Sequence, residues 1–160
     1  MRYFLLLMAT AFTACTITAQ TSGKPAANQS TIHKQIEEKQ FLFVAQTALP
    51  MRGRSVQLTS SYDLRISGDS VIAYLPYYGR AYSAPVNTYD GGIKFTSVKN
   101  TFTVKDRKKS GWEITIQPVD ANDIRELGLT IFPNGSASLR VTSNNRDPIS
   151  FNGMISQVKQ

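Results

Sequence analysis

Apolar and polar side chains alternate along most of the chain after residue 40. The clearest example starts at Trp112, where Trp112, Ile114 and Ile116 are separated by polar residues. A period of two is typical of a β-strand with one face buried and the other in solvent. Alternation or a short apolar run predicts strands at residues 41–47, 62–66, 71–75, 93–96, 101–105, 112–117, 127–131, 137–141 and 149–151.

Turn-forming residues separate these stretches. Residues 67–70 and 133–136 are expected to close tight hairpins, the second through an Asn-Gly pair that readily takes positive φ angles. Residues 143–148 predict another turn, 105–111 a charged hairpin tip, and 120–125 a single helical turn. Strands joined in this way favour an antiparallel meander. Because its apolar faces must be buried, we expect a mainly β domain closed as a β-barrel, with a β-sandwich as the alternative.

The first residues differ from the rest. Arg2 supplies a positive charge, and residues 3–12 form an apolar stretch that carries none. Such a stretch has the length of the apolar region of a signal peptide and is too short to span a bilayer as a helix. Residues 1–19 are therefore predicted to be an export signal.

Two processing routes remain open for this signal. One is cleavage after Ala19, beside small residues that fit a peptidase pocket. The other is lipoprotein processing at Cys15, whose thiol would carry the lipid; Phe12 stands where a lipobox usually has leucine. Since no other segment is apolar enough to span a membrane, attachment to a membrane is expected only through a lipid at Cys15.

Between the signal and the strands, the sequence predicts a linker and a short helix. Residues 20–29 are small and polar, as in a flexible tether. Ser30 is expected to cap a helix over residues 31–39, with Ile32 and Ile36 on one face at one end or edge of the barrel. The predicted organisation is a signal peptide (1–19), a flexible linker (20–29) and a single β-barrel domain with an N-terminal helix (30–160).

Composition argues against several classes of chemistry. Cys15 is the only cysteine and His33 the only histidine, which leaves no set for a disulfide, a Ser-His-Asp triad or a histidine-rich metal site. We therefore expect no enzyme activity, metal or cofactor. The net charge of +7 is scattered apart from residues 105–109, so a nucleic-acid partner is not expected. A carboxylate-dependent hydrolase is the remaining catalytic alternative, and Asp120 with Asp123 is as close in the sequence as any acidic pair beyond the helix.

Residues 74–85 stand out because they contain four of the seven tyrosines of the chain. In the structural interpretation, these rings pack one end of the barrel and keep their hydroxyls in water. In the functional interpretation, they stack on sugar rings or line a ligand pocket, and an arginine holds a carboxylate or phosphate. The candidate ligand-binding residues are Tyr74, Tyr77, Tyr78, Arg80 and Tyr82.

Several motifs point to a known family. The runs GDSVIAYLPYYGRA (68–81), GGIKF (91–95), SNNR (143–146) and PISFNG (148–153) resemble an uncharacterised domain-of-unknown-function family of exported Bacteroidota proteins, over about residues 35–155. This resemblance implies a lipocalin-like β-barrel in the periplasm or at the outer membrane of a Gram-negative bacterium. It brings no established activity and no catalytic residues.

Two non-catalytic functions follow from these expectations. The first is an exported envelope protein whose barrel binds a small ligand, a glycan or a lipid. The alternative is a structural or protein-interaction module of the cell envelope. An open cavity of several hundred cubic ångströms would favour the first function. A barrel filled by side chains, with an exposed apolar patch, would favour the second.

Overall fold

The computed structural model describes residues 25–82, 91–108 and 110–158, which form one helix and nine strands. The elements are α1 (Pro25–Glu37), β1 (Gln40–Pro50), β2 (Val56–Ser67), β3 (Ser70–Leu75), β4 (Ile93–Ser97), β5 (Asn100–Asp106), β6 (Trp112–Pro118), β7 (Ile124–Ile131), β8 (Ser136–Ser143) and β9 (Ile149–Ser156). Every stretch predicted as a strand lies inside one of these strands. The predicted signal peptide, with Cys15 and Ala19, lies outside the described residues.

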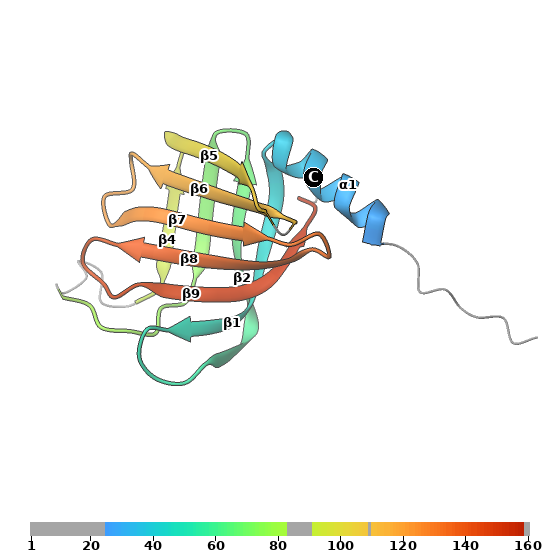
Figure 1. Ribbon diagram of the computed structural model, residues 1–160. Helices are drawn as coiled ribbons and strands as arrows, with labels where there is room; N and C mark the ends of the chain where they lie inside the picture. The colour runs from blue at the N-terminus through green and yellow to red at the C-terminus, as the bar shows by residue number, and fades with distance from the viewer. Residues whose placement is uncertain (1–24, 83–90, 109, 159–160) are drawn as a thin grey trace, which may run out of the picture.

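The strands form a single antiparallel sheet in the order β4-β3-β2-β1-β9-β8-β7-β6-β5. The first and last strands, β1 and β9, pair with each other, so the sheet curls round into a nearly closed barrel. In Figure 1, β5 to β9 lie across the front of the molecule, while β2, β3 and β4 cross behind them. The predicted mainly β meander and barrel are therefore confirmed.

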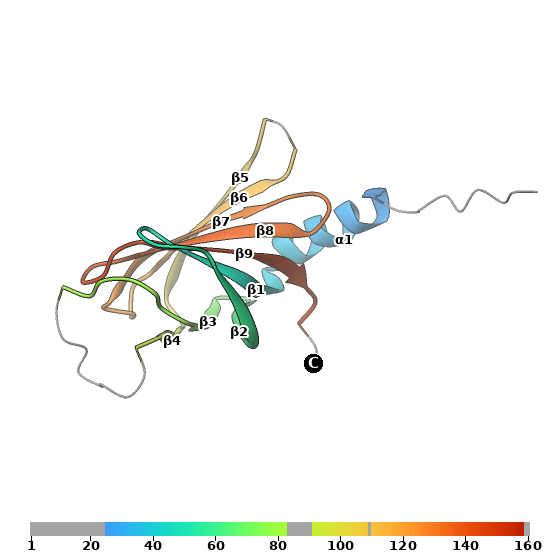
Figure 2. The ribbon, with the colours of Figure 1, turned by 90° about the horizontal axis from the view of Figure 1, so that it is seen from below.

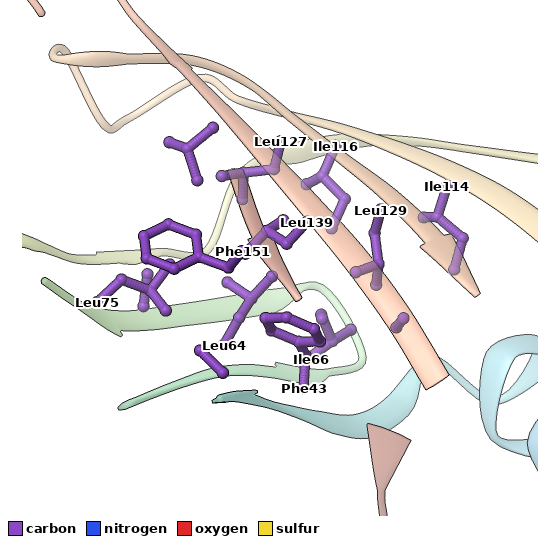
Figure 3. Close-up of a cluster of buried hydrophobic side chains, with 14 of the residues drawn as sticks. Phe43, Leu64, Ile66, Leu75, Ile114, Ile116, Leu127, Leu129, Leu139 and Phe151 are labelled. Atoms are coloured by element: carbon purple, nitrogen blue, oxygen red, sulfur yellow. The ribbon is translucent and has the colours of Figure 1, made fainter. Parts of the chain in front are cut away.

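The inside of the barrel is filled by apolar side chains. Strand β6 shows the expected alternation, because Trp112, Ile114 and Ile116 are buried and Glu113 and Gln117 are exposed. Side chains of the two crossing layers meet in the centre, as Figure 3 shows. The largest of those with almost no accessible surface are Phe41, Phe43, Leu64, Ile66, Leu75, Ile114, Ile116, Leu127, Leu129, Ile131, Leu139 and Phe151. Because these side chains have almost no accessible surface, this part of the interior is a packed core.

The largest departure from the predicted strands lies at residue 46 of β1, where the pairing with both β2 and β9 is irregular. Ala45 pairs with Tyr62, but Thr47 pairs with Gln57, so residues 58–61 lie opposite a single residue of β1. Bulges bend a strand and increase its twist, which suits a strand that joins both layers of the barrel. As a result β2 begins at Val56, well before the alternation that predicted it.

Helix α1 begins earlier than expected. It starts at Pro25, inside the predicted linker, and ends at Glu37. Proline is well suited to the first turn of a helix, where its missing N–H has no partner to lose. Ser30 therefore lies within the helix and does not cap it. Lys39, with a φ of 50°, leads the chain out of the helix and into β1.

The helix covers one end of the barrel through its apolar face, as expected. Ile32 and Ile36 are buried, and the Ile32 methyl group lies close to Gly135 in the turn between β7 and β8. The His33 ring lies 5.7 Å from the Trp112 ring, at the start of β6. Figure 2 shows α1 beside the ends of β1 and β9. In the described part of the chain, no helix has the length and apolarity needed to cross a membrane.

The connection between β6 and β7 does not contain the expected helical turn. Residues 119–123 form bends and a turn, and β7 already begins at Ile124. The prediction of a helical turn at 120–125 was wrong. Backbone groups of this connection instead bond to other segments: the Val119 amide donates to the Lys99 carbonyl, and Asn144 donates to the carbonyls of residues 122 and 123.

Candidate functional site

Three connections meet at the end of the barrel opposite α1. They are the segment after β3, the β6–β7 connection and the β8–β9 turn. Arg146, in the β8–β9 turn, joins all three. Its Nη1 donates to the carbonyls of Gly91 (2.9 Å) and Gly92 (3.3 Å), and its Nε lies 3.2 Å from the carboxylate of Asp123. Its guanidinium also lies 5.2 Å from the centre of the Tyr77 ring. Only 14% of the Arg146 side chain is exposed. Arg146 thus holds the three connections together, and we call this set of contacts the clasp.

Two of the candidate tyrosines take part in the same clasp. The Tyr77 hydroxyl lies 2.8 Å from the Arg80 carbonyl and 3.1 Å from the Asp147 carbonyl, and the Tyr82 hydroxyl donates to the Asp147 carboxylate. Backbone bonds from Asp147 to Arg80 and from Tyr82 to Asn145 run beside these contacts. Residues 77–82 are therefore fastened to the β8–β9 turn, and these two hydroxyls bond to protein atoms instead of lying in water as the structural interpretation had them.

Both hydroxyls remain protonated well into the alkaline range. Burial raises the pKa of Tyr77 above its usual value, and the neighbouring charge of Asp147 adds to the effect. The hydrogen bond to the Asp147 carboxylate raises the pKa of Tyr82, because ionisation would place two negative charges side by side. These tyrosines serve the fold as neutral donors.

A second group of aromatic residues lies on neighbouring strands at the same end. The Tyr74 ring of β3 stacks on the Tyr62 ring of β2, with centroids 5.6 Å apart and an interplanar angle of 20°. Lys94 of β4, which pairs with Tyr74 in the sheet, places its Nζ 4.4 Å from the centre of the same ring. Tyr74 still exposes 45% of its surface. Two aromatic rings and one cation are thus held together on the outside of the barrel.

These residues form one side of a surface pocket of about 210 Å³, which we call the aromatic pocket. It is lined by Tyr62, Tyr74, Leu75, Pro76, Tyr77, Tyr78, Gly91, Gly92 and Lys94. Of the five candidate residues, the structure thus brings Tyr74, Tyr77 and Tyr78 together. Arg80 and Tyr82 are not among the lining residues.

Sequence reasoning missed Tyr62 and Lys94. Both lie in stretches that were predicted correctly as strands. Lys94 alternates with the apolar Ile93 and Phe95, so its side chain was expected on the outer face. Their proximity to Tyr74 depends on which strands pair and in which register. The sequence offered one weak signal for Lys94. It lies in the GGIKF motif (91–95), which carries the family resemblance together with the tyrosine segment.

The two carboxylates considered for a hydrolase do not face a common cleft as a free pair. Asp120 accepts hydrogen bonds from the Ser97 hydroxyl and, at 3.0 Å, from the Val98 amide. These bonds, led by that of Ser97, lower the pKa of Asp120 below its usual value. Asp123 instead forms an ion pair with Arg146. Among the described residues, no group of three or more histidine, cysteine or acidic side chains is placed to hold a metal.

We expect Asp120→Asn to destabilise the protein at neutral pH and to have less effect in acid. A lowered folded-state pKa contributes stability above the unfolded-state pKa, and this contribution is lost as the pH falls through the folded-state value. Urea unfolding of wild type and variant should therefore give midpoints that differ at pH 7 and converge on acidification. Asp106→Asn, at the exposed end of β5, is the control and should show no such convergence. If the urea midpoints of wild type and Asp120→Asn differed by the same amount at all pH values, the lowered pKa of Asp120 would be contradicted.

Together these features define a small, mainly β protein with a packed, nearly closed barrel and an aromatic pocket on its outer surface. The chain matches the family model of DUF4251, a domain of unknown function, over residues 24–155, and it belongs to that family. The resemblance found in the sequence motifs is thereby confirmed.

A solved structure supports the fold. The chain is similar to the crystal structure of a DUF4251 family protein from Bacteroides eggerthii, with 15% sequence identity and a TM-score of 0.60. The similarity covers 84% of this chain and 92% of the other. No curated protein matches the sequence.

Proposed function

We propose that the protein is an exported, non-catalytic binding protein of the cell envelope, which recognises its ligand at the aromatic pocket and not inside the barrel. The observation that carries the proposal is the pocket itself, where four tyrosines meet Lys94 beside a core that is already filled. Export is supported by the signal-peptide pattern of residues 1–19.

The chemistry of the lining suits a sugar ring of a glycan, especially one with an anionic group. Tyrosine combines an apolar ring face with a hydroxyl, which matches the alternating apolar and hydroxyl surfaces of a sugar. Lys94 supplies the cation that was expected from Arg80. The volume of about 210 Å³ is smaller than the roughly 300–1,000 Å³ of pockets for drug-sized ligands. The pocket is therefore suited to a single sugar unit, with the rest of a longer glycan lying on the surface.

The pocket is largely organised before a ligand arrives. Tyr77 is fixed by its hydroxyl contacts with Arg80 and Asp147, and Gly91 and Gly92 are held by Arg146. Tyr74 is held between its strand neighbours and already stacks on Tyr62. Preorganised side chains lose little conformational entropy on binding, so a small contact area can still give useful affinity.

A non-catalytic role is supported by the residues that surround the pocket. Its lining side chains are tyrosine, leucine, proline and lysine, together with two glycines. This set offers no carboxylate pair for glycoside hydrolysis and no nucleophile with an adjacent base. Asp120 and Asp123, the acidic pair of the hydrolase alternative, are not among the lining residues and bond to other parts of the protein.

We expect Tyr78→Ala to weaken glycan binding by about three- to tenfold, which corresponds to the loss of one aromatic contact. Tyr78 exposes 38% of its surface at the pocket. The measurement is a screen of neutral and acidic oligosaccharides on the mature protein, followed by titration calorimetry on each hit. Phe132→Ala is the matched control, since Phe132 is also 38% exposed but lies in the connection after β7. Equal affinities for wild type and Tyr78→Ala, or a screen without hits, would refute the proposal.

An interaction module of the envelope is the second candidate. It is favoured by the filled core together with apolar side chains on the outer surface, among them Ile72 and Met154. A protein partner that binds this surface in the absence of any glycan, with affinity unchanged by Tyr78→Ala, would support this candidate in place of the first.

A further inference from the structure

Strand β5 is an edge of the sheet. It stands at the end of the strand order and pairs only with β6 among the described strands. Figure 1 shows it as the outermost strand of the front layer. Proteins commonly protect such edges with proline, with a bulge or with charges along the strand. Strand β5 has no proline and no break in its pairing with β6, and its two charges, Lys105 and Asp106, stand at one end.

Hydrogen bonds beyond both ends of β5 show which of its main-chain groups face outward. Before the strand, the Val119 amide donates to the Lys99 carbonyl at 2.8 Å, and after it the Arg107 amide donates to the Gly111 carbonyl at 3.0 Å. Both bonds continue the register of β5 with β6. In an antiparallel pair, residues that bond to the neighbouring strand alternate with residues that do not. The odd-numbered residues of β5 therefore bond to β6, and the N–H and C=O groups of the even-numbered residues point to the open side.

The even-numbered residues in the middle of β5 are Phe102 and Val104. No other described segment forms a hydrogen bond with their main-chain groups. Val104 exposes 45% of its surface, and Phe102 is half-buried against the core, with the Lys39 Nζ 5.3 Å from its ring centre. At the start of the strand, the Asn100 side chain donates to a carbonyl of the β2–β3 turn at 2.7 Å. The open part of the edge is therefore residues 101–105.

We infer that β5 pairs with the β5 of a second copy of the protein, antiparallel and about a two-fold axis at Thr103. With this axis, Phe102 of each copy lies opposite Val104 of the other, and both residues have outward N–H and C=O groups. Each of these two pairs forms two main-chain hydrogen bonds. A two-fold axis brings together the same surface of both copies, so the contact closes on itself and does not continue into a fibre.

The side chains of β5 match one another in this register. On one face, each Phe102 meets a Val104, which is a favourable aromatic and β-branched pair. On the other face, Thr103 meets Thr103, and Lys105 meets Thr101. No like charges stand opposite each other within residues 101–105. Strand β5 is therefore complementary to itself.

The neighbouring registers fit less well. With the axis at Val104, Phe102 would stand opposite Asp106. With the axis at Phe102, Val104 would stand opposite Asn100. Each shift places a polar side chain against an apolar one, so the axis at Thr103 is preferred.

The dimer is expected to be weak. Five paired residues per copy bury less than the roughly 1,200–2,000 Å² of a stable interface, and the basic Lys99 and Arg107 come together beyond each end of the pairing. Sedimentation equilibrium of the mature protein between about 10 μM and 1 mM should show monomer and dimer, with more dimer as salt screens these charges. A protein that stays monomeric, that forms larger oligomers or whose dimer dissociates in salt would overturn the inference.

Amide hydrogen exchange, followed residue by residue by NMR, locates the contact. The amides of Thr101, Thr103 and Lys105 should exchange slowly at every concentration, because they bond to β6. Those of Phe102 and Val104 should exchange fast in dilute solution and about fivefold more slowly at about 1 mM, where most chains are paired. Slow exchange of Phe102 and Val104 at all concentrations, or concentration-dependent protection of another strand, would contradict the pairing.

A charge swap at the axis tests the register. Thr103 is exposed, and Thr103→Lys and Thr103→Asp each place like charges opposite one another, so each should weaken dimerisation by about three- to fivefold. An equimolar mixture of the two variants should restore it. Thr96→Lys, at an exposed threonine of the other edge strand β4, is the control and should have no effect. Equal effects of Thr103→Lys and Thr96→Lys, or a mixture that dimerises no better than either variant, would rule out an axis at Thr103.

Val104→Pro tests the main-chain bonds. Proline is tolerated in an edge strand where its missing N–H faces away from the sheet. The change removes two of the four bonds of the dimer, so the variant should be monomeric at about 1 mM, with circular dichroism showing an intact β-structure. Tyr78→Ala, in the aromatic pocket, should dimerise like the wild type, which separates this inference from the glycan proposal. A folded Val104→Pro variant that dimerises like the wild type would overturn the inference.

Discussion

Gly153→Ala should lower the free energy of unfolding by about 3 kcal/mol, because the added methyl group has no room. Gly153 lies in β9 and faces β1. A Cβ atom there would be 2.0 Å from the Val44 carbonyl oxygen and 3.0 Å from a ring carbon of Phe43. The nearest of these atoms belongs to the backbone of the paired strand. It cannot move away without disturbing the β1–β9 pairing that joins the two halves of the sheet.

The control for this experiment is Gly128→Ala. Gly128 is also a strand glycine, in β7, but a Cβ built on it meets nothing within 4 Å. This change should leave stability within about 1 kcal/mol of wild type, or raise it, because alanine restricts the unfolded chain. Both variants are measured by urea unfolding. If they had similar effects, the close approach of β9 to β1 would not be the cause.

Phe151→Ala should lower the free energy of unfolding by about 3–5 kcal/mol. The Phe151 side chain has no accessible surface and lies among the core side chains of both layers (Figure 3). Its truncation removes apolar contacts and leaves a cavity that the barrel cannot fully collapse. Such a loss is a large part of the roughly 5–15 kcal/mol by which a domain of this size is stable.

The same variant tests whether the barrel interior is filled. An apolar cavity created in a core stays dry and can bind a small aromatic molecule such as benzene. We expect benzene to raise the melting temperature of Phe151→Ala and to leave that of wild type unchanged. Phe132→Ala, at an exposed ring, should cost less than about 1 kcal/mol and show no response to benzene. A response of wild type would mean that the interior already contains a ligand chamber.

Local alternation explains why the strands could be predicted. In the sequence, Trp112, Ile114 and Ile116 alternate with polar residues, and in β6 these three apolar side chains are buried. Such a pattern records which face of one strand meets the core, and it needs no knowledge of the neighbouring strand. For the same reason, the early part of β2 escaped prediction. Its residues 58–61 lie opposite the single residue 46 of β1, where regular pairing and alternating burial are lost.

The candidate site shows the limit of local information. The cluster of tyrosines in residues 74–82 indicated an unusual surface, but it could not separate Tyr78, at the pocket, from Tyr82, which bonds to Asp147. Arg80 was expected to hold an anion; it is not among the residues that line the aromatic pocket, and its carbonyl accepts hydrogen bonds within the clasp. These differences depend on the β8–β9 turn, which is distant in the sequence.

The sequence by itself determined the period of the strands, the tight turns between them and the family, and it predicted an export signal. All of these are recorded in neighbouring residues or in continuous motifs. Only the tertiary structure decided that β1 pairs with β9, that Tyr62 and Lys94 lie beside Tyr74, and that Arg146 joins three connections. The physical reason is that strand register and loop contacts arise from packing between segments far apart in the chain, where one alternating pattern is compatible with many partners.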